Sequence, residues 1–394
     1  MTSPDDGRPR GRRPMHIVFL NWRDTTNPEG GGSERYVENV AKRLVEAGHR
    51  VTVVCASYPH APADQMRDGI RFVRRGSKLG VYPAALWALV SRQLGAFDVV
   101  VDVQNGVPFL SRLVTRKPVV VLVHHVHREQ WSIVYGPRAA AVGWWVESRL
   151  APLVYRRCPY VAVSEVTRNE LAGLGVSPAR VSVVHNGTEP VPVTLPPTQV
   201  RPRSLVAVGR LVPHKRLEHA LATVATLREE FSDLNLTVVG DGWWAEELHA
   251  RAAHEGVSDI VEFTGFVDDA TKHEILARSQ VHLMPSVKEG WGIAIMEAAS
   301  RGVPTVAYRR AGGVSESVLD GMTGLLVDEG DSQFTAAVRL LLSDEELRAQ
   351  LGDAARTRAM TFTWEQTAKS FAVVLGAAPG RSDQRSGLRG QRLP

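Results

Sequence analysis

The 394-residue sequence has only two cysteines, Cys55 and Cys158. Two thiols cannot build a disulfide framework, so this scarcity fits a protein of a reducing compartment. No apolar run approaches the length of a membrane-spanning helix. The apolar run at 17–20, after the arginine-rich start, is too short for the core of a signal peptide. We therefore expect a cytoplasmic protein without a disulfide scaffold or a membrane-spanning helix.

The body of the chain also lacks an excess of charge. The formal net charge of +5 comes from the two ends: residues 1–13 carry four Arg and two Asp, and residues 377–394 carry four Arg and one Asp. A neutral body argues against a nucleic-acid partner. Gly, Ser, Pro and Arg dominate both ends, so we predict disordered basic tails there. We expect them to be solubilising ends, with weak peripheral contact to an anionic membrane as the alternative.

Short apolar runs alternate with helical patterns, which is typical of parallel sheets covered on both faces. Strands are expected at 16–22, 51–55, 99–103, 119–123 and 160–163, with a first helix over residues 33–47. Five prolines between residues 190 and 202 indicate a linker at 190–203. The pattern restarts with strands at 205–209 and 236–240 and a helix from about Leu217. The chain is predicted to form two doubly wound α/β domains.

The most informative segment is residues 285–298, where Glu289 and Glu297 are separated by seven residues. Gly290 and Gly292 allow the backbone to approach a ligand closely. The start of the following helix offers unpaired N–H groups to a diphosphate, and a carboxylate further along can accept from the vicinal hydroxyls of a ribose. For an isolated pair of glutamates, the alternative interpretation is an ordinary strand, turn and helix whose two glutamates face the solvent.

This segment resembles the E-x7-E signature of retaining glycosyltransferases of family 4. The resemblance extends over most of the second half, through residues 261–267, 302–307, 312–316 and 321–327. It implies the GT-B fold, in which two Rossmann-like domains face each other across a cleft. The implied organisation is an acceptor-side domain at 14–189, the linker, a nucleotide-sugar domain at 204–360, and a helix at 361–376 that crosses back to the first domain.

Residues 30–32 are three successive glycines between the first strand and the first helix. They are not the G-x-G-x-x-G dinucleotide fingerprint. Ser33 is a candidate helix cap. From the glycine run alone, a helix cap and a ligand-binding loop are equally favoured. The family resemblance implies that Gly31 and Gly32 lie against the donor's diphosphate and sugar.

Arg210 and Lys215 follow the first strand of the second domain. Ligands of open parallel sheets bind at the carboxyl edge of the strands, where two cations would neutralise a diphosphate leaving group. The common alternative is that both side chains are solvated charges on a surface loop without a ligand. The family has an Arg and a Lys at matching positions as phosphate ligands, which favours the functional interpretation. Arg216 has no such support.

A valine-rich strand ends in three histidines within four residues, His124, His125 and His127. Metal binding is one interpretation, but no further Cys or His cluster completes a site. The family places a histidine here, near the hydroxyls of the donor sugar. His124 fits this position best, and His125 is the register alternative because neighbouring residues of a strand point to opposite faces.

The implied activity is transfer of a hexose from a nucleotide diphosphate sugar to a hydroxyl on a glycan, lipid or small molecule, with retention of configuration. No D-x-D motif is present, and we predict no required metal and no cofactor. Catalytic roles are predicted for His124, Glu289, Arg210 and Lys215. The predicted donor-binding residues are Gly31, Gly32, Arg210, Lys215, Glu289, Gly290, Trp291, Gly292, Glu297, Gly312, Gly313 and Glu316.

Two other classes of protein remain open from the sequence. A nucleotide-sugar epimerase on the same fold would need no acceptor, and a binding protein would keep the donor site without catalysis. A phosphorylase would need a lysine for pyridoxal phosphate, and no lysine has a convincing context. Donors of the GDP-mannose and UDP-glucose types both fit. Trp and Arg residues within 131–155 could contact a sugar or a lipid headgroup, although simple packing is the more common use.

Overall fold

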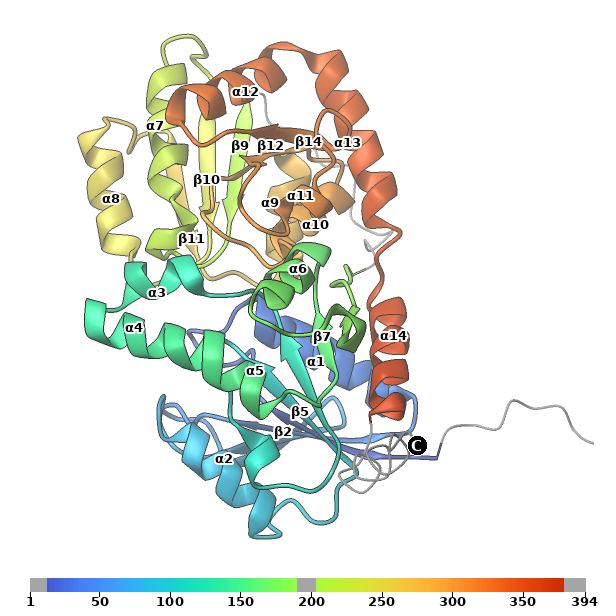
Figure 1. Cartoon of the computed structure of the whole chain (residues 1–394). Helices are drawn as coiled ribbons and strands as arrows, with labels where there is room; N and C mark the ends of the chain where they lie inside the picture. The colour runs from blue at the N-terminus through green and yellow to red at the C-terminus, as the bar shows by residue number, and fades with distance from the viewer. Residues whose placement is uncertain (1–12, 190–202, 379–394) are drawn as a thin grey trace, which may run out of the picture.

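The computed structural model describes residues 13–189 and 203–378. The predicted tails and the predicted linker lie outside the described residues, apart from Arg13, Arg203, Ala377 and Ala378 at their boundaries. Two α/β units are stacked one above the other, and the last helix runs down beside the first unit (Figure 1). The predicted class, two Rossmann-like domains with parallel sheets, is confirmed.

The first domain contains an eight-stranded sheet in the order β3-β4-β2-β1-β5-β6-β7-β8, with β3 antiparallel to β4 and the other pairs parallel. Its strands are β1 His16–Leu20, β2 Arg50–Cys55, β3 Asp64–Arg67, β4 Ile70–Arg74, β5 Val99–Gln104, β6 Val119–Val123, β7 Tyr160–Ala162 and β8 Val181–Val183. Its helical segments are α1 Gly32–Glu46, α2 Val81–Val90, η1 Ser111–Leu113, α3 Arg128–Val134, α4 Pro137–Trp145, the π turn η2 Val146–Leu150, α5 Ala151–Val154, α6 Glu165–Gly173 and η3 Pro178–Arg180.

The second domain contains a parallel six-stranded sheet in the order β11-β10-β9-β12-β13-β14. Its strands are β9 Ser204–Val208, β10 Asn235–Val239, β11 Val261–Gly265, β12 Val281–Met284, β13 Thr305–Tyr308 and β14 Gly324–Val327. Its helical segments are η4 Pro213–Lys215, α7 Leu217–Leu227, α8 Ala245–His254, α9 Asp269–Arg278, α10 Ile293–Ser300, α11 Val314–Ser317, α12 Asp331–Ser343 and α13 Glu345–Ala359; the chain continues into α14 Trp364–Ala377.

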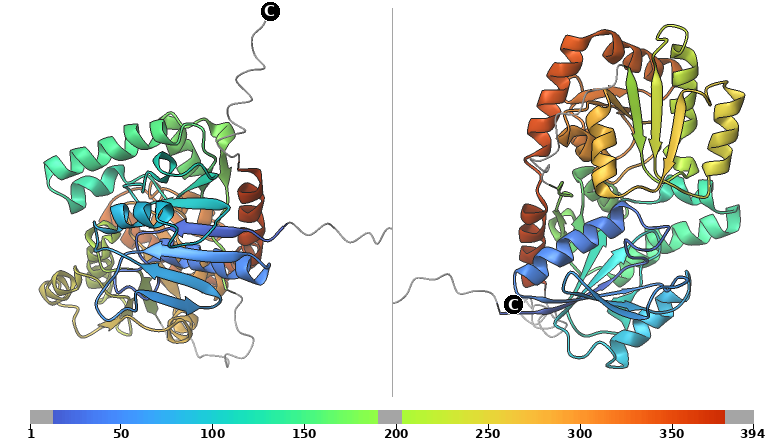
Figure 2. Two further views of the ribbon diagram at one scale, coloured as in Figure 1. Left: turned by 90° about the horizontal axis from the view of Figure 1, so that it is seen from below. Right: turned by 180° about the vertical axis from the view of Figure 1, so that it is seen from behind.

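β-Branched side chains that are buried on both faces of the sheet stabilise the central strands. All five residues of β6, four valines and a leucine, are buried, as expected for a central strand of a parallel sheet. Helices cover both faces of each sheet, which the view from behind also shows (Figure 2). Because helices cover the faces of both sheets, the two domains meet through the loops that follow the strands and not through the strands themselves.

Helix α14 packs along α1 of the first domain although it follows the second. Phe371 of α14 stacks on Phe19 of β1 at 6.0 Å between ring centroids, and Trp364 meets Tyr36 of α1 edge-on at 5.9 Å. Residues of both domains therefore share one hydrophobic core. This shared core ties the two domains together on the side of α14.

Two details of the sequence analysis are wrong or incomplete. Ser33 does not cap α1, because the helix begins at Gly32 with Gly31 as its N-cap, and Ser33 instead donates to the Glu34 carboxylate over 2.8 Å. The antiparallel pair β3–β4 was not predicted, since β3 at the sheet edge is mostly polar and two arginines interrupt the apolar residues of β4. Among the helices of the described residues, none is both long and apolar enough to cross a bilayer.

Candidate active site between the two domains

Loops that follow strands of both sheets meet where the two domains touch. A Cβ on Gly31, after β1, would lie 3.1 Å from Nε of Arg210, after β9. A Cβ on Gly290, after β12, would lie 2.2 Å from the carbonyl oxygen of His124, after β6. Because parallel α/β sheets bind ligands beyond the carboxyl ends of their strands, this contact region is the candidate site.

Glu289 is held by backbone hydrogen bonds to the loop after β13. Its N–H donates to the Ala311 carbonyl over 3.0 Å, and its carbonyl accepts from the Gly313 N–H over 2.9 Å. Gly312 has a φ of +69°, and a Cβ there would lie 2.5 Å from the Glu289 carbonyl oxygen. Conformation and space both require glycine at this position. The structure thus brings Gly312 and Gly313 against Glu289, and their contact with a phosphate stays a prediction.

Lys215 and Glu289 form an ion pair that is mostly shielded from water. Lys215 Nζ lies 2.5 Å from Glu289 Oε1, and the two side chains are 17% and 13% exposed. Burial opposes ionisation of Glu289, but the charge and hydrogen bond of Lys215 and a hydrogen bond from Ser286 outweigh it, so the pKa of Glu289 lies below its ordinary value. The Val287 N–H also donates to the His214 carbonyl over 2.9 Å, which joins the two loops.

Arg210 lies against the glycine-rich loop of the other domain. Its Nη1 donates to the Glu29 carbonyl over 3.3 Å. On the same loop, a Cβ on Gly32 would lie 3.4 Å from Cδ1 of Ile293, the first residue of α10. The predicted residues Gly31, Gly32 and Arg210 are therefore neighbours, and the start of α10 adjoins them.

The start of α10 is shaped by Gly292, whose φ of +88° places it in the left-handed region as the N-cap. A helix N-terminus presents backbone N–H groups and a positive dipole end, which favour an anion. Gly290 and Gly292 therefore serve different purposes in this loop: the first admits the backbone of the other domain, and the second turns the chain into the helix.

Glu297 of α10 is buried and its Oε1 accepts two charged hydrogen bonds. Arg35 of α1 donates from Nη1 over 2.9 Å, and Lys272 of α9 donates from Nζ over 2.6 Å. Both cations also pair with Asp269, and the pKa of Asp269 falls to about 2 because these cations outweigh its burial. Arg35 and Lys272 were missed by the sequence analysis. The position of Arg35 just after the glycine-rich loop was the one available signal.

His124 is almost fully buried beneath the contact between the domains. Its ring meets Tyr36 of α1 edge-on, with 5.3 Å between ring centroids, and its carbonyl oxygen accepts from the Thr167 hydroxyl over 3.2 Å. Its Nε2 has no hydrogen-bond partner in the described chain. Burial and the nearby His127 lower the pKa of His124 to about 3, so its imidazole is neutral at pH 7.

His125 lies in a different environment, beside His127 with 4.1 Å between ring centroids. Its Nε2 pairs with Gln130 Oε1 over 2.8 Å. Burial lowers its pKa well below the ordinary value, and the nearby His127 and His214 contribute to this shift. The pKa of His214 is itself lowered to about 4, by burial and then by the charge of Lys215. His125 thus belongs to a group of imidazoles next to Lys215, whereas His124 contacts the glycine of the signature, and both stay candidates for contact with the sugar.

Two predicted donor ligands, Trp291 and Glu316, contribute instead to the contact between the domains. The Trp291 side chain is 2% exposed and packs on His185 and Phe362, with ring centroids at 4.5 and 5.0 Å. The Glu316 carboxylate accepts from the backbone N–H groups that begin α6, over 2.9 and 2.7 Å, and its Oε2 lies 3.6 Å from His185 Nε2. These engaged side chains give the predicted donor contacts no geometric support.

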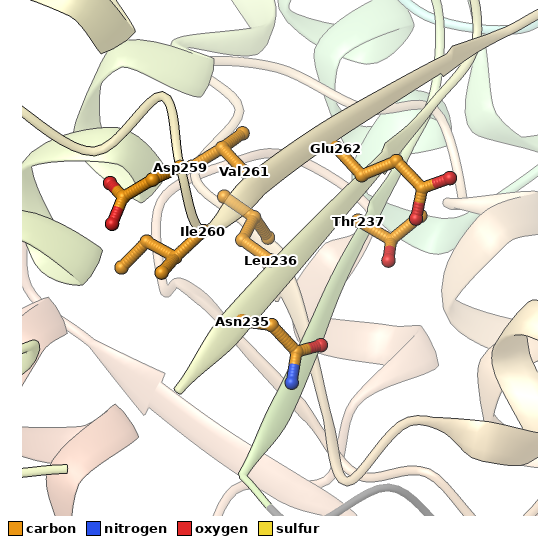
Figure 3. A pocket seen from close by; sticks show the side chains of 7 residues that line it. All are labelled: Asn235, Leu236, Thr237, Asp259, Ile260, Val261 and Glu262. Carbon is orange, nitrogen blue, oxygen red and sulfur yellow. The ribbon is translucent and has the colours of Figure 1, made fainter. Parts of the chain in front are cut away.

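A pocket elsewhere on the second domain does not belong to this site. Figure 3 shows its seven lining residues, which come from the first residues of β10 and β11 and from the turn before β11; they are Asn235, Leu236, Thr237, Asp259, Ile260, Val261 and Glu262. The beginnings of parallel strands lie at the edge opposite to the one that carries Arg210 and Lys215.

Within residues 13–189 and 203–378, no group of three or more His, Cys, Asp or Glu is arranged to hold a metal ion.

Two family profiles match consecutive parts of the chain. The profile described as Glycosyltransferase Family 4 matches residues 30–191, and the one described as Glycosyl transferases group 1 matches residues 197–358. The chain belongs to glycosyltransferase family 4. The first profile begins at the glycine-rich loop, and the second covers Arg210, Lys215 and the E-x7-E segment.

Relatives align over almost the whole chain. A glycogen synthase of Mycobacterium tuberculosis is 26% identical over 96% of this chain and 97% of that protein. An MMP alpha-(1->4)-mannosyltransferase of Mycolicibacterium hassiacum is 29% identical over 93% of this chain and 99% of that protein. A GDP-mannose-dependent phosphatidylinositol monomannoside mannosyltransferase of Mycolicibacterium smegmatis is 28% identical over 91% of this chain and 97% of that protein.

Solved structures show the same fold. Sucrose-phosphate synthase from Thermosynechococcus elongatus has a TM-score of 0.77 at 19% identity, covering 93% of this chain and 100% of that chain. The Anabaena protein HepE, solved with UDP-glucose, has a TM-score of 0.71 at 19% identity, covering 92% and 100%. The protein is therefore a GT-B glycosyltransferase that moves a sugar from a nucleotide sugar. These matches favour the transferase over the epimerase and over the non-catalytic binding protein.

Proposed function

We propose that this enzyme transfers a hexose from GDP-mannose or UDP-glucose to an acceptor hydroxyl with retention of the anomeric configuration. The observation that supports this most directly is the shielded pair of Lys215 and Glu289 at the shared edge of β9 and β12. A cation for the leaving diphosphate and a carboxylate for the transferred sugar are thereby held at the same point. The mannosyl and glucosyl relatives make these two donor types the first to test.

The nucleoside end of the donor is assigned to Glu297. Arg35 and Lys272 both contact Oε1, which fixes the orientation of the carboxylate and leaves Oε2 to accept from the vicinal hydroxyls of a ribose. Hydrogen bonds to a charged partner are stronger than those between neutral groups. Glu297 then fixes the distance of the diphosphate from Lys215.

The diphosphate is assigned to Arg210, Lys215 and the backbone of the glycine-rich loops. Arg210 and Gly31 lie against each other across the domain contact, so a phosphate bound beside them would meet the guanidinium and the start of α1 together. Two fixed cations stabilise the negative charge that develops on the leaving group. This arrangement supports charge stabilisation by the protein's own side chains, and we propose that transfer needs no metal ion.

The transferred sugar is assigned to Glu289 and to one of the two histidines, His124 or His125. In the proposed step, the bond from the anomeric carbon to the diphosphate oxygen breaks, and a bond to the acceptor oxygen forms on the same face of the sugar. The acceptor proton passes to the leaving phosphate oxygen. Both histidines are neutral at pH 7 because burial lowers their pKa, so they serve as hydrogen-bonding groups rather than as cations.

The test is a transfer assay with UDP-glucose and GDP-mannose, with the product analysed by NMR. Retention predicts an α-linked product from either α-linked donor. The matched variants are Glu289→Gln, which removes the carboxylate at constant size, and Glu262→Gln, at an exposed position of β11 away from the site. Loss of transfer in the first variant alone supports the assignment. A β-linked product would exclude retention, and full activity in Glu289→Gln would exclude the role of this carboxylate.

A further inference from the structure

An exposed apolar stripe runs along the continuous helical segment from α4 through η2 to α5. Val142, Trp145 and Leu153 are 63%, 56% and 62% exposed. Arg138 and Arg149 lie in the same stripe, because the spacings along 138, 142, 145, 149 and 153 are four, three, four and four residues. The opposite face, with Ala140, Gly143, Glu147 and Ala151, is buried. We call the five exposed residues the α4–α5 stripe.

The orientation of this helix is fixed from its buried side. Glu147 is fully buried and accepts from Trp131 Nε1 over 2.7 Å and from the His127 backbone N–H over 3.1 Å. The Trp131 ring lies against Gly143, where a Cβ would approach within 2.5 Å. These contacts clamp α4 to α3, so the apolar stripe cannot turn inward without breaking them. Exposure of Trp145 is therefore a fixed feature of the fold.

The exposed charged residues of the segment 137–157, which contains the stripe, all have one sign. Glu147 is the only acidic residue between 137 and 157, and it is buried. The same segment contains four exposed arginines, Arg138, Arg149, Arg156 and Arg157. A surface with exposed Trp, Val and Leu and only positive charges is complementary to an anionic interface with an apolar interior. A nucleic acid would pair with the arginines but would leave the apolar side chains in water.

The stripe also has a favourable place in the molecule. Helices α3 and α4 project from the first domain as a pair, and both views show them standing clear of its sheet (Figures 1 and 2). Ile133, Val134 and Tyr135, at the tip of this pair, are 40% to 42% exposed. Helix α3 also touches η4, the segment that carries Lys215. A surface held by α4 would thus lie next to the candidate active site.

We propose that the α4–α5 stripe docks the enzyme on an anionic phospholipid bilayer. Trp145 enters the interface between headgroups and acyl chains, Val142 and Leu153 follow it, and the arginines contact lipid phosphates. This binding lies beyond the sugar transfer proposed above and does not depend on it.

The experiment is co-sedimentation of the full chain with vesicles of phosphatidylcholine alone or of phosphatidylcholine mixed with phosphatidylglycerol. We expect binding only to the anionic vesicles, weakened by salt. Trp145→Glu places a carboxylate in the centre of the stripe and should weaken binding about tenfold. Arg138→Gln combined with Arg149→Gln should weaken it by a similar factor.

The matched control is Trp87→Glu on α2, where Trp87 is 64% exposed, and it should leave vesicle binding unchanged. Circular dichroism and the melting temperature establish that each variant is folded. Equal binding by wild type and Trp145→Glu, equal loss in Trp87→Glu, or no vesicle binding by wild type would each overturn the proposal. So would self-association through the stripe in sedimentation velocity. Nucleotide binding, measured in parallel, should be the same in all these variants, which separates this proposal from that of the donor site.

Discussion

Arg35 of the first domain donates a hydrogen bond over 2.9 Å to Glu297 of the second, the carboxylate that we assign to the ribose. The same guanidinium reaches Asp269 Oδ1 over 2.6 Å. A side chain next to the glycine-rich loop therefore contacts the nucleoside end of the proposed donor site. If Glu297 binds the ribose as proposed, Arg35 couples donor binding to the contact between the domains.

We predict that Arg35→Gln raises the KM for the donor about tenfold and changes kcat little. The substitution removes a charged donor from Glu297 and weakens a contact between the domains, which together amount to roughly 1–2 kcal/mol. Steady-state kinetics with varied donor concentration measures both constants. Arg43→Gln is the matched control, because Arg43 also lies on α1 and pairs with Glu365 of α14 away from the site. An equal rise in KM in the control would show that Arg35 acts only through domain packing.

Lys215→Met should lower kcat about a hundredfold or more, the size of effect seen when one donor to a developing negative charge is removed. The neighbouring Arg216→Gln serves as the control, since Arg216 pairs with Glu329 rather than with Glu289. Single-turnover measurements at saturating donor separate the chemical step from binding. A normal rate in Lys215→Met would remove this residue from the mechanism.

Gly290→Ala tests the close approach of the two domains. The added methyl would lie 2.2 Å from the His124 carbonyl oxygen, so the backbones must move apart at the candidate site. We expect transfer to fall by at least an order of magnitude and the melting temperature to drop, since strain of this kind costs about 1–3 kcal/mol. Gly173→Ala is the control, because nothing lies within 4 Å of its added methyl. Full activity in Gly290→Ala would show that the close contact is dispensable.

Stability should decrease as the pH falls below about 6.5, because buried imidazoles, among them those of His124, His282 and His214, become protonated on unfolding. The pKa is lowered to about 3 for His124 and His282 and to about 4 for His214, mainly by burial. A group whose pKa is lower in the folded state binds more protons when unfolded, so its contribution is complete above the unfolded pKa and is lost toward the folded one. Each imidazole contributes a slope of roughly 1.4 kcal/mol per pH unit in that window.

Urea unfolding at a series of pH values between 7.5 and 5 measures this slope. His124→Gln should reduce the slope of unfolding free energy against pH by the contribution of one imidazole. His254→Gln, at an exposed position of α8, should leave the slope unchanged. A slope that is unchanged in His124→Gln would mean that His124 titrates normally in the folded protein.

The sequence allowed the two-domain α/β fold to be predicted because its signals are local. Valine-rich runs such as β6 act through burial, and a few neighbouring residues are enough to reveal them. The pair β3–β4 escaped prediction because its polar residues lie at a sheet edge, where alternation with a buried face is weak. Ser33 was misjudged as a cap, because the N-cap is Gly31, two residues earlier, and Glu34 accepts from the Gly31 N–H.

The candidate site was only partly predictable, and the reason is distance along the chain. The E-x7-E segment and Arg210 with Lys215 are short motifs, and the structure brings the predicted Lys215 and Glu289 together. Arg35 meets Glu297 across 262 residues of sequence, a contact that no local pattern encodes. The side chains of Trp291 and Glu316 contact His185 and the start of α6 in the other domain, and no local pattern encodes these contacts either.

The most direct test of the donor site is calorimetric titration of the full chain with UDP, GDP and their sugar conjugates. We predict that one nucleotide family binds and that Arg210→Gln combined with Lys215→Met raises the Kd at least a hundredfold, as expected when two charge-assisted contacts to a diphosphate are lost. Binding with an unchanged Kd in the double variant, or no binding of any nucleotide to the wild type, would contradict it.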